Sequence, residues 1–226
     1  NRNRAISKDK LRPFLNIKLA ADYAPELHSH PLIRFYEENR YMMELSAAYM
    51  GLKEYDIIHT QDIFSSRALS RVKPAHVPLI TQVHGSVSGE LHNHFRLHPH
   101  LGIEENSPAW RYCKSIEYYG ATAGDVTITS TQWQKNELVY DFGIPEHRIT
   151  VFQYGLDTTD FWYRAQAGTT LQRPPGKKVI IFPARLSFVK GVDVLISALG
   201  MLKYMRNDWE CWIVGDGDKR EELERQ

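Results

Sequence analysis

Short apolar runs rich in β-branched residues recur along the sequence and alternate with segments that have the length of helices. Four such runs occupy residues 55–60, 78–84, 125–130 and 149–154. Each run is short and follows a polar or proline-containing stretch, which is typical of buried strands in a parallel sheet. Because parallel strands need crossover connections between them, the alternation predicts a doubly wound α/β domain.

Helices are predicted between and before these runs. Residues 34–50 have a helix-favouring composition, and Gly51 can end that helix. Residues 131–142 form another expected helix, because Ser130 or Thr131 can cap its start and Gly143 with Pro145 can end it. Residues 62–72 fill the space between the first two predicted strands and form a third expected helix. Residues 14–20 are predicted as an additional strand near the start of the chain.

A second α/β pattern fills the last part of the sequence. Residues 178–184 and 210–215 are predicted as strands, and residues 191–204 as the helix between them, with an apolar stripe along one side. Residues 218–226 begin a further helix. Two strands and two helices are too few to bury a hydrophobic core without disulfides or a structural metal ion. We therefore expect this second domain to be incomplete in the sequence.

The two patterns are separated by a polar segment with two prolines and two glycines, which predicts a linker at residues 166–177. We therefore assign residues 1–165 to an N-terminal Rossmann-like domain on the acceptor side and residues 178–226 to the start of a C-terminal domain. No glycine-rich strand-to-helix turn occurs near the N-terminus. The first strand of the N-terminal domain is therefore expected to be missing.

Charge and cysteine content limit the classes of function. The sequence has 28 basic and 27 acidic residues and a net charge of +1, so a nucleic-acid partner is not expected. Its two cysteines lack a metal-binding or redox spacing, which favours a reducing, cytoplasmic compartment. Most of the charged residues among positions 2–18 are basic. This predicts either a solvated terminal segment or a peripheral contact with an anionic membrane.

A loop with two cations follows the strand predicted at residues 178–184. It carries Arg185 and Lys190, and the next helix opens at Gly191. Parallel sheets bind ligands at the carboxyl ends of their strands, and a helix N-terminus offers free N–H groups and a positive dipole. A diphosphate fits such a site, and the cations would stabilise charge on a leaving phosphate. The alternative interpretation is two solvated cations beside a helix start.

The string LHNHFRLHPH is rich in histidine. Two His-x-His pairs could bind a metal ion, but no cysteine or carboxylate pattern completes a known site. We expect a loop whose histidines face solvent or an acceptor, and we predict no metal site.

The motifs, taken in order, resemble those of a known enzyme family. The cationic loop lies within IIFPARLSFVKGVDVLISAL, which is followed by WIVGDG; upstream lie YDIIHTQD, ITQVHG, DVTITSTQWQKNEL and FGIPEHRITVFQYGLDTTDF. This set resembles the retaining GT-B glycosyltransferases of family 4, the sucrose-synthase and mannosyltransferase-like group. The resemblance covers residues 55–226. It implies two Rossmann-like, doubly wound domains with a cleft between them.

The resemblance also implies a reaction. A hexose would move from a nucleoside-diphosphate sugar to a hydroxyl of a sugar, lipid or small-molecule acceptor, with retention of configuration. The nucleotide sugar would be a co-substrate, and neither a cofactor nor a divalent metal would be needed. Arg185 and Lys190 would be catalytic through the donor phosphates. His84 would be the third catalytic residue, near the transferred sugar.

Glycines complete the site that the resemblance implies. Gly191, Gly215 and Gly217 would shape the donor-binding loops, and Gly85 would let the backbone come close at the cleft. Two family features, the Glu-x7-Glu segment and an N-terminal glycine-rich loop, do not occur, so this stretch alone is expected to be inactive. Gln61 stands where a histidine is frequent.

Two other classes of function stay open. Another GT-B enzyme, either a trehalose-type phosphorylase or synthase or a nucleotide-sugar epimerase, would share the fold. A noncatalytic nucleotide-binding module would share the phosphate site but would tolerate the loss of Arg185 or Lys190.

Overall fold

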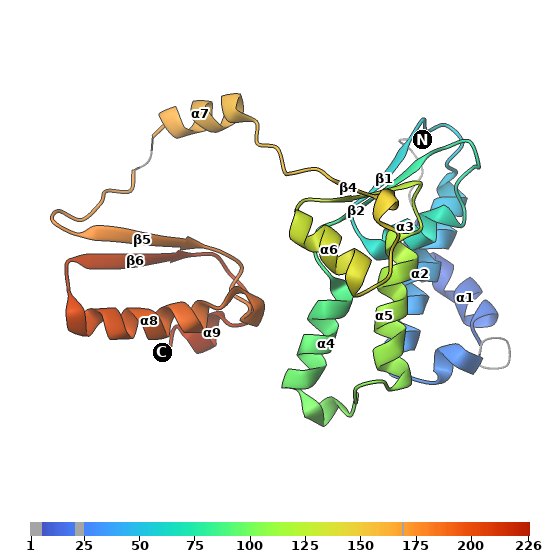
Figure 1. Ribbon diagram of the computed structural model, residues 1–226, viewed down its shortest axis with the longest axis horizontal. Coiled ribbons are helices and arrows are strands. Elements are labelled where there is room, and N and C mark those ends of the chain that lie inside the picture. Colours follow the sequence, from blue (N-terminus) through green and yellow to red (C-terminus); the bar gives the residue numbers. More distant parts are fainter. Residues whose placement is uncertain (1–5, 21–24, 169) are drawn as a thin grey trace. The chain divides into compact units, whose positions relative to one another are not determined.

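A computed structural model describes residues 6–20, 25–168 and 170–226 of the chain (Figure 1). The chain divides into two compact units, Asn1–Gly155 and Leu156–Gln226. The exposed helix α7 (Thr158–Gln166) opens the second unit. The domain boundary expected at residues 166–177 lies beyond this division and stays a prediction.

A four-stranded parallel sheet forms the centre of the first unit. Its strands are β1 (Ile58–Thr60), β2 (Leu79–Val83), β3 (Val126–Thr129) and β4 (Ile149–Val151), and they lie side by side in that order. All four strands were predicted, which confirms the α/β class. The parallel register brings the carboxyl ends of the strands to one edge of the sheet.

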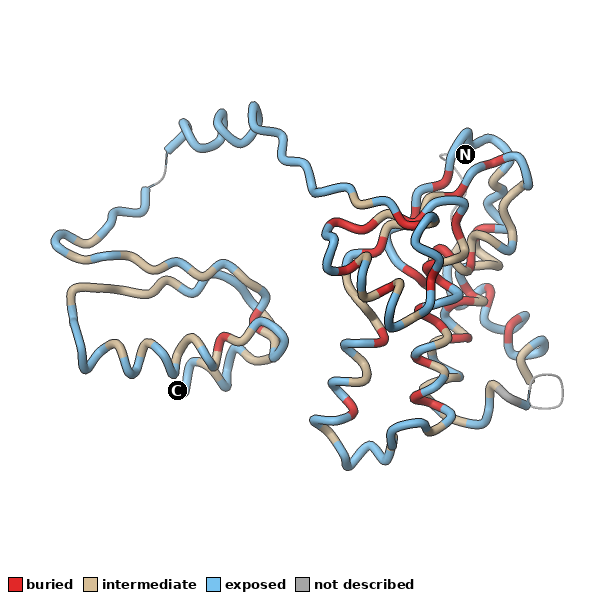
Figure 2. Tube along the Cα trace, viewed as in Figure 1, coloured by how far each residue is buried: buried red, intermediate tan, exposed pale blue. Residues whose placement is uncertain are grey.

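The helices that connect these strands are α3 (Ile63–Ser70), α4 (Val87–Leu97), α5 (Pro108–Ala121) and α6 (Gln132–Tyr140), with short 3-10 turns η2 (Pro99–Leu101) and η3 (Glu146–Arg148). On β2, Leu79, Thr81 and Val83 are buried while the alternate residues are partly exposed. One face of the sheet therefore meets the core, as strand alternation requires. Buried positions, drawn red, gather in this unit (Figure 2). The largest core cluster joins residues from the strands, α3, α5, α6 and the loop after α6: Ile63, Val83, Ile116, Ala121, Leu138, Ile144 and Ile149.

Two helices precede the sheet in sequence: α1 (Lys8–Lys18) and α2 (Pro31–Met50), with the 3-10 turn η1 (Pro25–His28) between them. The strand predicted at residues 14–20 was wrong, because α1 covers most of that stretch. Leu11 and Leu15, four residues apart, are both buried and pack with Met42 of α2. This helical spacing outweighs the apolar run that suggested a strand.

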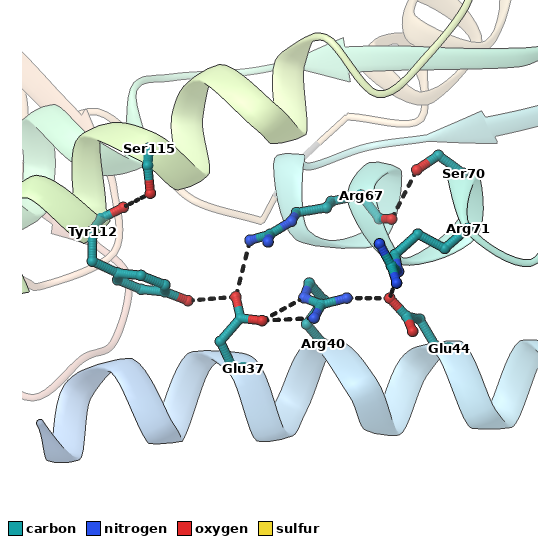
Figure 3. A network of polar contacts seen from close by, with 8 residues as sticks. All are labelled: Glu37, Arg40, Glu44, Arg67, Ser70, Arg71, Tyr112 and Ser115. Atoms are coloured by element: carbon teal, nitrogen blue, oxygen red, sulfur yellow. Dashed lines mark hydrogen bonds and ion pairs between the residues drawn. The ribbon is translucent and has the colours of Figure 1, made fainter. Parts of the chain in front are cut away.

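A buried network of charged side chains joins α2 to α3 and α5 (Figure 3). Glu37 accepts hydrogen bonds from Arg40 at 2.6 and 2.8 Å, from Arg67 at 2.9 Å and from the Tyr112 hydroxyl at 2.9 Å. Burial alone would raise the pKa of Glu37, but the hydrogen bonds and charges of these partners lower it below its ordinary value. Both oxygens of the ionised carboxylate are therefore hydrogen-bonded, and these bonds hold the three helices against one another.

The second unit contains a two-stranded parallel sheet. Its elements after α7 are β5 (Lys178–Pro183), the 3-10 turn η4 (Phe188–Lys190), α8 (Val192–Met205), β6 (Trp209–Val214) and α9 (Arg220–Leu223). Both strands were predicted, and the structure pairs β5 and β6 along their full length. Among the described residues of this unit, those that are buried are Leu186 and Val192, in and just after the loop that follows β5. In the described part of the chain, no helix is long and apolar enough to cross a membrane.

Candidate functional site

The loops that follow β5 and β6 are joined by backbone hydrogen bonds. The Ala184 N–H donates to the Val214 carbonyl at 3.0 Å, and the Leu186 N–H donates to the Asp216 carbonyl at 2.9 Å. The Lys219 N–H then donates back to the Leu186 carbonyl at 3.0 Å. The two loops therefore form one surface at the carboxyl edge of this sheet, where α/β proteins bind ligands.

Two glycines allow these loops to approach so closely. A Cβ atom on Gly215 would lie 1.8 Å from the Ala184 carbonyl oxygen, and one on Gly217 would lie 2.2 Å from the Leu186 carbonyl oxygen. Both distances are far below van der Waals contact with backbone that cannot move aside. Glycine is thus required at both positions by the packing, while their role in donor binding stays a prediction.

The predicted cations lie on the first of these loops. Arg185 and Lys190 are exposed, and neither side chain makes an ion pair or hydrogen bond within the described residues. Gly191 adopts a left-handed conformation (φ 63°, ψ 32°) and begins the 14-residue helix α8, whose N-terminus has no side-chain cap. Free helical N–H groups and two unpaired cations in one loop favour an anion, with phosphate the best match.

Ser187 is a residue of this loop that sequence analysis missed. Its hydroxyl oxygen is buried and has no hydrogen-bond partner among the described residues. A buried unsatisfied hydroxyl is costly, so the loop holds a polar group that a ligand could satisfy. A serine in a loop carries no signal that would have marked it in advance.

In the first unit, His84 lies at the carboxyl end of β2 within a chain of polar side chains. Its Nδ1 lies 2.5 Å from the Tyr154 hydroxyl, and its Nε2 lies 2.8 Å from Oε1 of Gln61. Because the Gln61 oxygen can only accept, Nε2 carries the proton and Nδ1 accepts from Tyr154 in the neutral ring. Gln61 continues the chain to Nε2 of His59 at 3.2 Å.

A cavity of about 200 Å³ opens beside His84 at the carboxyl ends of β1 and β2. Its wall includes the predicted residues His84 and Gly85 together with carboxylates from the starts of α3 and α4. The lining residues are Gln61, Asp62, Ile63, Val83, His84, Gly85, Val87 and Glu90. Polar donors and acceptors around a small open cavity suit a hydroxyl-rich ligand.

The histidine-rich string lies on α4 and the turn after it, so the expectation of a loop was wrong. The His92 ring stacks on Trp110 with centroids 3.8 Å apart and bonds to the Trp110 carbonyl at 3.0 Å, while burial lowers the pKa of His92. Nδ1 of His98 donates to the His94 carbonyl at 2.8 Å, at the end of the helix. In the described ranges, no group of three or more histidine, cysteine or acidic side chains is placed to hold a metal ion. The expectation of a metal-free site stays a prediction.

Comparison with known families matches almost the whole chain. The family described as Glycosyltransferase Family 4 matches residues 9–160, and that described as Glycosyl transferases group 1 matches residues 169–226. The chain is 24% identical to an uncharacterized glycosyltransferase of Methanocaldococcus jannaschii, over 80% of the chain and 45% of that protein. It is 23% identical to a glycogen synthase of Mycobacterium tuberculosis, over 74% of the chain and 37% of that protein. The chain thus spans less than half the length of these relatives.

A solved structure has a similar fold. It is a mutant of S. aureus TarM in complex with fondaparinux, alpha-GlcNAc-glycerol and UDP, which aligns with a TM-score of 0.56 and 12% identity. The alignment covers 83% of this chain and 33% of that one. This likeness confirms the predicted GT-B type of α/β fold.

Proposed function

Because this chain belongs to glycosyltransferase family 4, we propose that the whole protein transfers a hexose from a nucleoside-diphosphate sugar to an acceptor hydroxyl with retention of configuration. The co-substrate is the nucleotide sugar, and neither a cofactor nor a divalent metal takes part. UDP and a sugar in the complex of the similarly folded TarM support a nucleotide donor and a sugar acceptor. A lipid or another small molecule would offer the same hydroxyl chemistry.

The observation that carries this proposal is the pair of unpaired cations beside the uncapped start of α8. When the bond between the anomeric carbon and the phosphate oxygen breaks, its electron pair stays on the leaving diphosphate. Arg185 and Lys190 would stabilise that charge, and the positive end of α8 would add to their effect. Such cations accelerate the reaction because the charge is larger in the transition state than in the bound donor.

His84 has a separate role in this proposal, near the transferred sugar. A hydrogen bond that its Nε2 donates to Gln61 and one that its Nδ1 accepts from Tyr154 orient its ring at the mouth of the cavity that it lines with Gly85. Either partner could exchange for a sugar hydroxyl, which offers both a donor and an acceptor. Gly85 leaves its own side of the cavity free of a side chain.

Contact with an anionic membrane surface in the cytoplasm forms part of the proposal. Arg2 and Arg4 lie outside the described residues, but Lys10 and Lys18 are exposed on α1 together with Phe14 (65% exposed) and Ile17 (66% exposed). Lysines beside exposed apolar side chains suit the interface of an anionic bilayer. Sedimentation with phosphatidylglycerol vesicles should retain the protein, and equal recovery with neutral vesicles would contradict this contact.

The experiment that tests the proposed function measures release of free nucleoside diphosphate by the whole protein over a panel of donors and acceptors. Glucose and sugar phosphates belong on the acceptor panel. We expect release that depends on an acceptor, and a product whose anomeric configuration by NMR matches that of the donor. Acceptor-independent isomerisation of the donor would instead identify an epimerase. Consumption of a disaccharide with phosphate would identify a phosphorylase, and binding without turnover a noncatalytic module.

A further inference from the structure

The backbone on both sides of His84 is held by one buried side chain, that of Gln134 in α6. Gln134 is 3% exposed. Its amide, turned so that both ends are satisfied, donates to the Val83 carbonyl at 3.1 Å and accepts from the Gly85 N–H at 2.7 Å. A two-point bond of this kind fixes the direction in which the chain leaves β2, and therefore the position of the His84 side chain.

A second buried side chain, Glu117 of α5, holds the segment that continues from Gly85 into α4. Glu117 is 0% exposed, and its Oε2 accepts from the Ser88 N–H at 2.8 Å. The Ser88 hydroxyl donates to the Cys113 carbonyl one turn earlier on α5. Ser86 caps α4 by accepting the Gly89 N–H at 2.9 Å. Hydrogen bonds to α5 and α6 thus hold the Val83–Ser88 segment in place.

Glu117 has a titratable group that this bonding does not need. Its second oxygen, Oε1, is buried without a hydrogen-bond partner among the described residues. A carboxylate in that position is costly to bury, whereas a glutamine would make the same bond to Ser88 without a charge. Because a glutamine would stabilise the fold at a lower desolvation cost, we infer that the carboxyl group of Glu117 has a role besides stability.

The surroundings of Glu117 favour its protonated form. Burial is the main cause that raises the pKa of Glu117 to about 7; the hydrogen bond from the Ser88 N–H opposes this rise, and the nearby carboxylate of Glu137 in α6 contributes to it. Burial also raises the pKa of Glu137, as does the charge of Asp141, while the Ser86 hydroxyl lowers it. On α5 itself, burial raises the pKa of the Cys113 thiol to about 11, so that group stays neutral. The charge of the Glu117 carboxyl group can therefore change near neutral pH.

We propose that Glu117 is a positioning residue for the transfer reaction, which holds the Val83–Ser88 segment so that His84 and Gly85 face the donor sugar. This inference rests on the proposed function. Glu117 does not touch the sugar; it acts through the hydrogen bond to Ser88 and the start of α4. The state of its carboxyl group changes how firmly the segment is held, and so it changes the rate of transfer.

The test compares two variants of the whole protein with the wild type. Glu117→Gln keeps an acceptor for the Ser88 N–H but cannot titrate, so its kcat at neutral pH should stay close to that of the wild type. Its pH–rate profile should lose the inflection near pH 7. Glu117→Leu removes the acceptor, and its kcat should fall by about 10- to 100-fold, because small displacements of reacting groups are this costly. Binding of UDP or GDP alone should not change, since the phosphate loop belongs to the second unit.

Tyr112→Phe serves as the matched control, because it removes a partly buried hydroxyl on the same helix, and that hydroxyl donates to Glu37 rather than to the segment. Its pH–rate profile should keep the wild-type inflection. Unchanged kcat in Glu117→Leu, or an unchanged inflection in Glu117→Gln, would overturn the proposal. If Glu117→Leu does not fold, the profile of Glu117→Gln decides alone. Failure of the wild type to release any nucleoside diphosphate overturns the proposed function and this inference together.

Discussion

The Tyr154 hydroxyl lies 2.5 Å from Nδ1 of His84, although the two residues are 70 positions apart in the sequence. Their rings are also stacked, with centroids 5.6 Å apart and planes inclined by 13°. Parallel strands β2 and β4 end at the same edge of the sheet, which brings the two loops together. Tyr154 therefore orients His84 by both a hydrogen bond and ring contact.

Replacing Tyr154 by phenylalanine tests this relationship. The Tyr154→Phe variant keeps the stacked ring but leaves Nδ1 of His84 without its donor. One hydrogen bond is worth about 0.5–1.5 kcal/mol, so kcat/KM should fall by about 2- to 10-fold. Tyr140→Phe, at an exposed site on α6, is the control and should leave kcat/KM unchanged. Equal kcat/KM in both variants would show that Tyr154 does not orient His84.

Gly215→Ala should disrupt the phosphate loops. The new Cβ would lie 1.8 Å from the Ala184 carbonyl oxygen, so the loop that carries Arg185 must shift. We expect binding of UDP or GDP to be lost in calorimetry and the melting temperature of the whole protein to fall. Gly200→Ala on α8 is the matched control, since nothing lies within 4 Å of its Cβ. It should retain binding and gain up to about 1 kcal/mol in stability. Normal binding by Gly215→Ala would contradict this account of the loops.

Glu37→Ala should strongly destabilise the chain. It removes the carboxylate that the buried Arg40 and the partly exposed Arg67 share, and Arg40 keeps only its ion pair with Glu44. The free energy of unfolding should therefore fall by about 3 kcal/mol. Glu38→Ala breaks the exposed pair with Arg34 on the same helix and should cost at most about 0.5 kcal/mol. Urea denaturation of both variants measures the difference. A similar small loss in each would mean that the network does not hold the helices.

The stability of the chain should depend on pH through Glu117. Its pKa is raised to about 7 in the folded chain, above the ordinary value of 4.5 for a glutamate. A raised pKa means that its contribution to stability is fully present below pH 4.5 and is lost as the pH rises through 7. Relative to Glu117→Gln, the wild-type free energy of unfolding should fall by up to about 1.4 kcal/mol per pH unit in that window. Parallel curves for the two proteins across it would exclude this titration.

Local patterns were enough to predict most of the fold. The four β-branched runs became β1 to β4, and the strands predicted in the second α/β pattern became β5 and β6. The apolar stripe in residues 191–204 became α8, because burial of alternate or helically spaced side chains is a local property. The stretch at residues 14–20 was misassigned because its buried pair, Leu11 and Leu15, begins outside it. Helix α7 ends where the predicted linker begins, in a stretch where no helix was predicted.

The position of the candidate phosphate loop could be predicted because this loop has a recognisable sequence pattern. Arg185, Lys190 and Gly191 stand together in sequence beside a strand end and a helix start, and the structure places them there. Glu117 and Gln134 could not be identified in this way, because a polar residue within a helix is usually exposed. Their burial follows from the packing of α5 and α6 under the segment that follows β2, which involves residues far apart in sequence.

The central claim is that the loop after β5 binds and stabilises the leaving diphosphate of a nucleotide sugar. Release of nucleoside diphosphate by the whole protein should therefore be measured for Arg185→Ala and Lys190→Ala, with Arg173→Ala, an exposed cation before β5, as the control. Each of the first two variants should lose about 100- to 1,000-fold in kcat, because each removes charge from the leaving group. The control should keep wild-type turnover. Unchanged turnover in both Arg185→Ala and Lys190→Ala would contradict the account.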